Sequence, residues 1–443
     1  MQLHGWGRYP RHESELVNVM APDEVPALVA SRSSMIARGN GRAYGDAAIG
    51  ERATLATRGL NRMKSFNPAT GCLTVEAGVL LGDVLQTFVP RGFFPPVVPG
   101  TKLVTVGGMI AADVHGKNHH RDGGFGSHVQ EFKLVLPGGK TVTCSPRENR
   151  ELFDATVGGM GLTGVIVEAT FTMKPIETGW IMQRTTVAGD LAAALKALDA
   201  AQNATYSVAW IDCLARGTAL GRSLVFAGEH AMADEVRLAR PKKELFPPAR
   251  RRRLRVPIDL PACILHRASV AAFNEVYFRL GSRRGEEPFL VHWEPYFFPL
   301  DAIEDWNRIY GRRGFVQHQC VVPTGTAPSV LGEILERVTL SGKASFLAVL
   351  KKMGRAGGVL SFPMEGYTLA LDLQVADDVF ALLDDIDRIV AAAGGRLYLA
   401  KDARQTPRTF EAGYPRLGEF KDIRRSISAE GCLTSQLSRR LAI

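Results

Sequence analysis

The chain has 443 residues, of which 46% are hydrophobic and 22% charged, a balance typical of folded globular proteins and not of disordered or collagen-like chains. Its 54 lysines and arginines against 45 acidic residues give a net charge of +9, which favours anionic ligands, phosphates or an anionic membrane surface. No run of about 18 uninterrupted apolar residues occurs, so we expect no transmembrane helix. The opening residues MQLHGWGRYPRHESE lack an apolar core, so we expect no secretory signal.

The length predicts two or three domains, because single hydrophobic cores rarely grow beyond about 250–300 residues. The cysteines are scattered and form no CxxC pair, which favours free thiols in a reducing cytosol over a disulfide framework or a zinc site. They are Cys72, Cys144, Cys213, Cys263, Cys320 and Cys432.

The first third of the chain is rich in short apolar runs and glycine turns. These runs predict strands at residues 35–37, 73–77, 132–136, 141–144 and 165–173, and helices at residues 80–89 and 149–157. Pro137, Gly138 and Gly139 separate two of the strands, which predicts a hairpin.

The middle of the chain alternates strand-like and amphipathic helical patterns. Strands are predicted at residues 206–212, 289–296, 315–322, 345–351 and 367–375, and helices at residues 191–202, 302–310, 330–339 and 377–393. Strands mixed with covering helices indicate an α+β domain with a largely antiparallel sheet.

Residues 240–255, RPKKELFPPARRRRLR, are too rich in proline and charge for a regular element, so a mobile loop is expected. Two interpretations stay open, a solvated linker and a basic lid or membrane-facing loop.

Two glycine-rich loops are candidates for holding an anion. Residues 39–46 follow a short strand, and successive N–H groups in such a turn can bind phosphate oxygens, with Arg38 or Arg42 adding charge. Residues 99–108 form a second loop of this kind. Either loop alone can be purely structural, but together they can hold one pyrophosphate.

Residues 159–164 match the GxGxxG pattern of dinucleotide-binding proteins. That pattern requires a strand before it and a helix after it. Here a predicted helix precedes it and a predicted strand follows it, so we expect a tight turn near a cofactor or simple glycine packing.

The segment VGGMIAADVHGKNHHRDGGFG, residues 106–126, places ionisable groups after paired glycines, which let a backbone approach a flat or anionic ligand closely. His115 and His119 are four residues apart, but Gly116 and the loop-like surroundings argue against a helical zinc site. Structural histidines remain an alternative. We favour contact of His115, Lys117, His119 and His120 with a cofactor ring and an anionic substrate.

Polar groups on the later strands are further candidates. Gln317 and Gln319 are two apart on a predicted strand, so they share one face; they are either solvent-exposed or line a polar pocket. Lys351 ends another predicted strand. Tyr398 and Lys401 lie near the end of a third, where a lysine can hold a phosphate or neutralise a developing anion, although a structural role is equally compatible.

Six segments together resemble the vanillyl-alcohol-oxidase-type flavoproteins, which bind FAD through a PCMH-type domain. Within them, the similarity is greatest to the decaprenylphosphoryl-β-D-ribose 2-oxidase group and runs nearly end to end. The segments are ARGNGRAYGD (37–46), PGTKLVTVGGMIAADVHGKNHH (99–120), LFDATVGGMGLTG (152–164), SFLAVLKKMG (345–354), LSFPMEGYTLALD (360–372) and GGRLYLAKDAR (394–404). HGKNHH with YLAKDAR is specific to this group, whereas aldonolactone oxidases of the same fold carry a different histidine motif.

The resemblance implies an α+β flavoprotein of two domains. An FAD-binding domain would span residues 1–178, and a substrate-binding domain with a largely antiparallel sheet would span residues 179–395, with the basic loop near 240–256. Residues 396–443 would return to the FAD domain. The implied cofactor is FAD, held noncovalently in this group, although many relatives bind it covalently through a histidine equivalent to His115.

The resemblance also implies roles for individual residues. The catalytic residues would be Lys401, Tyr398 and His115. The residues implied to hold the cofactor are Arg38, Gly39, Asn40, Gly41, Arg42, Ala43, Tyr44, Gly100, Thr101, Thr105, Gly107, Gly108, Asp113, His115, Gly116, Asn118, His119, Gly161, Gly164, Val165 and Tyr398. The residues implied to contact the substrate are Tyr44, Lys117, Gln317, Gln319, Lys351, Ala370 and Lys401. No metal site is implied.

The implied reaction oxidises the C2 hydroxyl of a polyprenyl-phosphoryl-β-D-ribose to a 2-keto sugar, the first half of an epimerisation to a cell-envelope arabinose donor. Lys401 would orient the alcohol or accept its proton, supported by Tyr398, and Lys117 with the basic loop would hold the phosphate. The implied partners are a short-chain keto-reductase and a quinone-type electron acceptor. We expect a cytoplasmic protein with peripheral contact at the inner face of the plasma membrane and no nucleic-acid partner.

Three positions depart from the group's pattern. A pocket cysteine, the target of covalent inhibitors, aligns with Ala370, a pocket serine with Val208, and a pocket tyrosine with Phe297. The identity of the lipid or sugar is therefore open. Two other functions also stay open: an aldonolactone or sugar-alcohol oxidase of the same fold, and a non-enzymatic polyprenyl-phosphate-binding protein.

Overall fold

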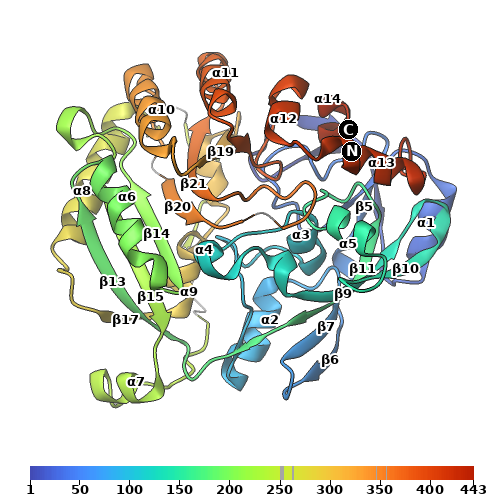
Figure 1. The fold of residues 1–443 in the computed structure, drawn as a ribbon, viewed down its shortest axis with the longest axis horizontal. Helices are drawn as coiled ribbons and strands as arrows, with labels where there is room; N and C mark the ends of the chain where they lie inside the picture. Colours follow the sequence, from blue (N-terminus) through green and yellow to red (C-terminus); the bar gives the residue numbers. More distant parts are fainter. Residues whose placement is uncertain (250–253, 262–263, 346, 356) are drawn as a thin grey trace.

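A computed structural model describes residues 1–249, 254–261, 264–345, 347–355 and 357–443. Two groups of sheets lie side by side (Figure 1). One group is built from strands before residue 176 and is joined by the C-terminal helices; the other is a single large sheet from the middle of the chain. The fold is therefore the two-domain α+β architecture expected from the sequence.

The first group contains a five-stranded antiparallel sheet in the order β10-β9-β11-β7-β6 and a three-stranded parallel sheet in the order β3-β5-β4. Two short pairs, β1-β2 and β12-β8, complete it. Its strands are β1 (Gln2–His4), β2 (Arg11–Glu13), β3 (Glu15–Asn18), β4 (Met35–Arg38), β5 (Ala53–Ala56), β6 (Met63–Asn67), β7 (Cys72–Glu76), β8 (Phe93–Phe94), β9 (Val129–Val135), β10 (Thr141–Cys144), β11 (Val165–Thr172) and β12 (Lys174–Pro175). Its helices are α1 (Glu24–Ser31), α2 (Leu81–Phe88), α3 (Val106–Ala111), α4 (His119–Asp122) and α5 (Arg150–Thr156).

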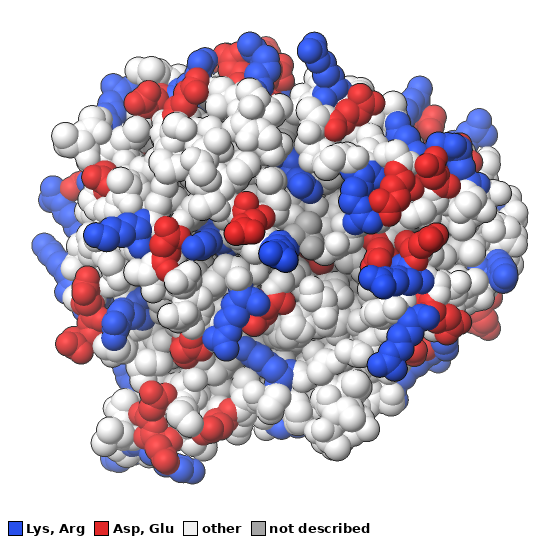
Figure 2. Space-filling view, in the orientation of Figure 1, with Lys and Arg blue, Asp and Glu red and all other residues white. Residues whose placement is uncertain are grey.

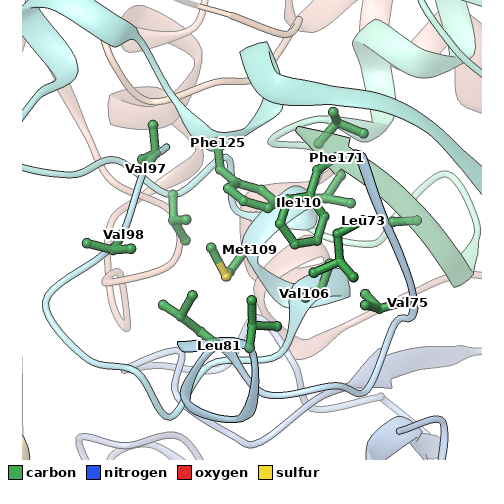
Figure 3. Packing of buried hydrophobic residues seen from close by; sticks show 14 of the residues in the cluster. Leu73, Val75, Leu81, Val97, Val98, Val106, Met109, Ile110, Phe125 and Phe171 are labelled. Atoms are coloured by element: carbon green, nitrogen blue, oxygen red, sulfur yellow. The ribbon is translucent and has the colours of Figure 1, made fainter. Parts of the chain in front are cut away.

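Helix α3 carries the paired glycines, and its position is set by the core beneath it. Val106, Met109 and Ile110 lie on one side of the helix and are buried against apolar side chains of β7, β11 and the neighbouring loops (Figure 3). The spacing of three and four residues places these side chains on one face. Gly107 and Gly108 line a cavity. A Cβ on Gly107 would lie 2.9 Å from the Cβ of buried Ala77, so glycine there lets the helix pack closely against the segment that follows β7.

The second group is an eight-stranded sheet in the order β17-β13-β15-β14-β20-β21-β19-β22, antiparallel throughout. Its strands are β13 (Trp180–Ala188), β14 (Tyr206–Ile211), β15 (Ser223–His230), β17 (Phe289–His292), β19 (Phe315–Pro323), β20 (Ala348–Met353), β21 (Gly366–Gln374) and β22 (Arg396–Leu397). Helices α6 (Leu191–Ala200), α10 (Ala327–Ser341) and α11 (Asp377–Ala392) pack an apolar core against one face of the sheet. The other face is directed toward the first group.

Further elements border this sheet. They are α7 (Ala233–Ala239), α8 (Arg267–Ser282), α9 (Trp293–Phe297) and the parallel pair β16 (Leu254–Arg255) and β18 (Ile303–Glu304). In the part of the chain that is described, no helix has both the length and the apolar character that crossing a membrane requires. The five described cysteines are free thiols; Cys263 lies outside the described residues. Positive and negative side chains alternate over the face drawn in Figure 2, so the excess positive charge forms no single patch there.

The C-terminal helices α12 (Pro407–Gly413), α13 (Leu417–Ser426) and α14 (Gln436–Leu441) return to the first group of sheets. Leu433 forms a parallel bridge with Met35. On α14, Arg440 donates to Asp46 at 2.8 Å and to Asp402 at 2.9 Å. One guanidinium therefore joins the end of the first glycine loop to the residue after Lys401.

Most elements expected from periodicity are present, and the exceptions have local causes. The strand predicted at 289–296 ends at His292, where the His292 imidazole caps helix α9 by accepting from the Glu294 N–H at 3.0 Å. The helix predicted at 302–310 is instead β18 followed by a 3₁₀ turn, because Asp305 has φ of 54° and breaks a continuous helix.

Other differences concern segments without a strong pattern. The strand predicted at 345–351 spans Ala348–Met353, and Lys401 lies in a turn after the two-residue strand β22 instead of at a strand end. Strands β13 and β15 and helix α8 were not predicted. Of the segment 240–255, residues 250–253 lie outside the described residues, so the prediction of a basic loop there is untested.

Candidate active site

A cavity of about 950 Å³ is lined on one side by the glycine loops and on the other by the free face of the eight-stranded sheet. Most residues singled out from the sequence meet in its wall, although they come from distant parts of the chain. They are Gly39, Asn40, Gly41, Arg42, Ala43, Tyr44, Gly100, Thr101, Thr105, Gly107, Gly108, His115, Gly116, Lys117, Gly161, Gly164, Gln317, Gln319, Lys351, Ala370, Tyr398 and Lys401.

The two glycine loops are fastened to each other. The Asn40 amide donates to the carbonyl of Leu103 at 2.7 Å. A Cβ on Gly39 would lie 2.2 Å from Oγ1 of Thr105, so only glycine permits this approach. No hydrogen bond within the described chain uses the backbone N–H groups of residues 40–43. These donors border the cavity and are open to a ligand's acceptor oxygens.

The second loop is also held from the opposite domain. Asp301 accepts from the Thr101 hydroxyl and from the Lys102 backbone N–H, both at 2.8 Å. The Lys102 ammonium forms a buried ion pair with Glu294 of α9. The loop is therefore fixed before any ligand binds, which lowers the entropy cost of binding.

Five residues from the predicted cofactor set do not line the cavity, and most of them support its wall. Arg38 donates to the His4 carbonyl at 2.7 Å. Asp113 accepts from the Gly126 N–H at 3.0 Å, Asn118 donates to the Pro96 carbonyl at 2.8 Å, and His119 accepts from the Gly354 N–H at 3.0 Å. Val165 is buried in the core behind the first glycine loop.

His115 is buried at the meeting point of the two domains. Its Nδ1 lies 3.1 Å from the Lys351 ammonium nitrogen, and its Nε2 lies 3.1 Å from the Gln319 amide nitrogen. Burial, followed by the charge of Lys351, lowers the His115 pKa well below 6.5. The imidazole is thus neutral, with both ring nitrogens engaged by side chains of the sheet.

Strand β19 presents alternate side chains to opposite faces, as its sequence predicts. Gln317 and Gln319 face the cavity, where the Gln319 amide also donates to the Thr368 hydroxyl at 3.2 Å. His318 faces the helices and pairs with Asp387 of α11 at 2.9 Å. The glutamine pair lines a polar pocket and is not solvent-exposed surface.

Three lysines converge on the cavity. Burial lowers the pKa of Lys117 to about 7 and that of Lys351 to about 8. Lys117 donates to the Tyr296 carbonyl, and its ammonium lies 4.5 Å from the centre of the Tyr296 ring. Three buried amines in one cavity favour an anionic ligand, because an anion would offset the cost of protonating them.

Lys401 lies against Tyr44, with its nitrogen 3.6 Å from the centre of the ring. Burial lowers its pKa from 10.5, the nearby Asp372 carboxylate opposes that change, and Lys351 adds to it. The Asp372 carboxyl is itself buried, which raises its pKa, and it accepts a hydrogen bond from Gln317. Lys401 therefore has an amine that can release or accept a proton near neutral pH.

Tyr398 contributes its ring and not its hydroxyl. The hydroxyl donates to the Ala112 carbonyl at 2.9 Å, and burial raises its pKa above 10. The ring stacks on Phe362, with centroids 4.6 Å apart, and contacts His115 at 5.4 Å. These contacts fix the Tyr398 ring in the cavity wall, so its role in the structure is to shape that wall.

Two carboxylates of the site were missed from the sequence. Asp372 lies in an otherwise apolar strand, LALDLQV, and a lone acid in a buried strand is a recognisable anomaly. Asp301 lies two residues after Pro299 in a short 3₁₀ turn and carries no such mark. The three departures from the family pattern, Val208, Phe297 and Ala370, all line the cavity.

Comparison with known proteins places this geometry in a family. Residues 9–145 match the family model described as "FAD binding domain". The chain is 36% identical over 453 aligned positions to decaprenylphosphoryl-beta-D-ribose oxidase of Mycolicibacterium smegmatis, covering 100% of this chain and 97% of that protein. It is 37% identical to the "uncharacterized protein in mprA 5′ region" of Streptomyces coelicolor, covering 82% of this chain and all of that one. A putative D-arabinono-1,4-lactone oxidase of Neurospora crassa is 30% identical over only 26% of this chain.

Proposed function

Because the chain belongs to the decaprenylphosphoryl-β-D-ribose oxidase family of FAD-dependent oxidoreductases, we propose that it oxidises the C2 hydroxyl of a polyprenyl-phosphoryl-β-D-ribose to the 2-keto sugar. The observation that carries the proposal is the end-to-end similarity to the oxidase. The aldonolactone oxidase alternative rests on partial similarities, to a putative D-arabinono-1,4-lactone oxidase over 26% of this chain and to a probable L-gulonolactone oxidase of Arabidopsis thaliana over 42% of it. Because the chain belongs to a family of oxidoreductases, the alternative of a non-enzymatic polyprenyl-phosphate-binding protein is not favoured.

The cavity fits FAD, the cofactor of the family. Free N–H donors at residues 40–43 and side-chain-free backbone at Gly100, Gly107 and Gly108 would hold the pyrophosphate. The wall at His115 and Gly116 would lie beside the flavin ring. When bound, FAD accepts the hydride that leaves C2 of the sugar.

We propose that the cofactor is bound noncovalently. Both nitrogens of His115 already have partners within 3.1 Å, Lys351 and Gln319. A covalent link would have to displace one of them. Removing the polypeptide by acid precipitation should therefore release all of the FAD into solution.

Lys401 is the proposed proton acceptor. Oxidation of a secondary alcohol removes a hydride from carbon and a proton from oxygen, so a base must take the proton as the C=O bond forms. A lysine with a lowered pKa exists partly as the free amine, and the carboxylate of Asp372 stabilises the ammonium formed after transfer. Gln317, which donates to Asp372, would keep that carboxylate in place.

Lys117 and Lys351 are proposed to hold the phosphate of the substrate. Both ammonium groups reach the cavity without a carboxylate partner among the described ion pairs. The singly charged phosphodiester of the substrate would raise their pKa values above about 7 and 8 and so bind the lysines in the charged, hydrogen-bonded form.

The product requires a second enzyme. Inversion at C2 needs a hydride returned to the opposite face of the ketone, so we propose a separate short-chain keto-reductase as partner. A quinone-type acceptor would reoxidise the flavin, and the lipid substrate implies peripheral contact with a membrane.

Anaerobic flavin bleaching tests the function directly. Adding polyprenyl-phosphoryl-β-D-ribose to the FAD-loaded protein should remove the absorption near 450 nm and yield a product two mass units lighter. Lys401→Ala should retain FAD but show no bleaching. Bleaching by a soluble aldonolactone and not by the ribosyl lipid would overturn the proposal.

A further inference from the structure

Exposed apolar side chains are concentrated in one segment of the molecule. Of the 13 large apolar side chains that are exposed in the described part of the chain, seven lie between Leu254 and Leu280. Scattered exposed apolar residues are normal, whereas a contiguous group marks a surface that contacts something apolar.

Helix α8 carries the centre of this group. Phe273, Val276 and Leu280 are 47%, 58% and 57% exposed, and with Tyr277 they form a stripe at the spacing of one helical face. An adjoining face docks the helix onto the sheet: Val270 and Asn274 are buried, and Asn274 donates to Asp212 at 2.7 Å. The helix is thus held along one edge of the stripe, and Phe273, Val276 and Leu280 remain exposed.

The stripe adjoins the opening of the substrate cavity. Tyr277 and Arg284 both line the cavity, yet Tyr277 is also exposed on the surface. The Tyr277 ring contacts Trp210 with centroids 4.8 Å apart, and Phe226 and Val291 extend the apolar wall inward. The amines of the site lie elsewhere in the same cavity. The cavity is therefore apolar near the stripe and polar where Lys351 and Lys401 converge.

Positive charge borders the stripe. From Arg267 to Arg284 the chain has four arginines and one acidic residue, Glu275. Glu275 is paired with Arg222 at 2.7 Å and with Arg279 at 2.5 Å, which leaves Arg267, Arg283 and Arg284 without an acidic partner among the described ion pairs. The next acidic residue is Glu286. In Figure 1, α8 lies at the outer edge of the molecule, opposite the C-terminal helices, where a flat surface can reach it.

We propose that the stripe Phe273–Val276–Leu280 and its arginines dock the protein on an anionic lipid bilayer, with the cavity opening turned toward the membrane. This inference rests on the proposed function, because a polyprenyl tail makes such an opening useful. The apolar side chains enter the acyl boundary, and the arginines contact lipid phosphates. The sugar phosphate reaches the lysines while its tail passes from the bilayer along the apolar wall.

A second copy of the chain is a poorer occupant of this surface. In a two-fold dimer the same patch meets itself. The arginines between residues 267 and 284 of one copy would then face those of the other, and like charges at an interface oppose association. An anionic bilayer supplies the complementary charge.

The test measures vesicle binding without any substrate. Co-sedimentation of the FAD-loaded protein uses vesicles of phosphatidylcholine with and without phosphatidylglycerol. We expect binding to the anionic vesicles, with a partition coefficient at least about tenfold lower for the triple variant F273S/V276S/L280S. The matched control M232S/L238S/L340S removes three exposed apolar side chains elsewhere and should bind like the parent. Equal binding by both triple variants would overturn the proposal.

Two further measurements separate the alternatives. A Leu280→Cys variant carrying an environment-sensitive fluorophore should shift its emission to the blue on anionic vesicles, whereas Leu340→Cys should not. A dimer in solution that the stripe variant converts to monomers, with no vesicle binding by the parent, would assign the surface to a second copy and refute lipid docking.

Failure of this inference is distinguishable from failure of the proposed function. The stripe variant should bleach with a short-chain, water-soluble phosphoryl ribose at the parent's rate and lose at least about tenfold in rate with the long-chain substrate in vesicles. An absence of bleaching by either substrate in the parent would reject the function but leave the vesicle result to stand by itself.

Discussion

The ammonium nitrogen of Lys351 lies 3.1 Å from Nδ1 of His115, although the two residues are 236 positions apart in sequence. One is on strand β20 of the eight-stranded sheet, and the other is in the loop after the glycine helix α3. The pair joins the two domains at the wall where the flavin ring is proposed to lie. It also keeps the imidazole neutral, because a cation next to it disfavours a second positive charge.

Replacing Lys351 with methionine should raise the pKa of His115. The charge of Lys351 is the largest contribution after burial to the lowering of that pKa, so its removal shifts the titration upward. NMR titration of histidine-labelled protein measures the change. Lys352→Met is the matched control, because Lys352 is paired with Asp199 at the surface. An unchanged His115 titration in Lys351→Met would contradict the contact.

The rate of flavin reduction should rise with pH until Lys401 is deprotonated and then stay level. The amine can accept the alcohol proton only in its free form, and burial places its pKa below 10.5. Below that pKa the rate should fall about tenfold per pH unit. Stopped-flow reduction at saturating substrate measures it. The Lys401→Arg variant should bind FAD but should lose both rapid flavin reduction and its dependence on pH. A rate of flavin reduction that falls as the pH rises would exclude a base at this position.

Replacing Asp372 with asparagine should move that profile to lower pH. The Asp372 carboxylate raises the pKa of Lys401, and an opposite charge at close range typically contributes about 1–3 pKa units. The free amine should therefore persist at more acidic pH in the variant. Asp384→Asn removes an exposed carboxylate paired with Arg404 and should leave the profile unchanged. A shift of the Asp372→Asn profile to higher pH would show that the carboxylate acts in another way.

Gly39→Ala should weaken FAD binding by at least about tenfold, equivalent to about 1.4 kcal/mol. Its Cβ would lie 2.2 Å from the Thr105 hydroxyl, so the two glycine loops would have to separate. Fluorescence titration of FAD into the cofactor-free protein measures the affinity. Gly325→Ala places its Cβ in open space and should bind FAD normally. Equal affinities would show that the close approach of the loops is not needed.

Ala370→Cys should create a labelling site that the parent lacks. Ala370 lines the cavity, and the resemblance described from the sequence aligns it with a pocket cysteine that covalent inhibitors target. Peptide mapping by mass spectrometry after treatment with such an inhibitor should find an adduct at residue 370 only in the variant. Protection by bound substrate would be the accompanying control, and an adduct at the corresponding peptide of the parent would contradict the alignment.

Residues of the cavity wall could be predicted from the sequence where they lie together in a short motif. The run of glycines from 39 to 46, the HGKNHH segment and the alternation of Gln317 and Gln319 each describe a short stretch of backbone whose geometry follows from its residues. Part of the antiparallel sheet was predictable for the same reason, since β14 and β21 contain apolar runs, whereas β13 and β15 were not predicted.

The remainder depends on contacts between distant segments. Nothing near Asp301 indicates that it holds the loop at Thr101, and the partner of Tyr398 is a backbone carbonyl at Ala112, which no side-chain pattern encodes. Helix α8 escaped prediction because its outward face is apolar, so its pattern does not separate a buried side from a solvated one.

Arg440 connects the last helix, α14, to two segments of the candidate active site. It donates hydrogen bonds to both Asp46 and Asp402. Asp46 ends the loop proposed to hold the pyrophosphate, and Asp402 follows the proposed base, Lys401. A truncation that removes α14, or a substitution of Arg440 alone, would leave these two buried carboxylates without this counter-ion. Both the first glycine loop and the turn that carries Lys401 would then be displaced. Inherited or engineered changes at this terminus should therefore be classed with those of the active centre, despite the long stretch of chain between them.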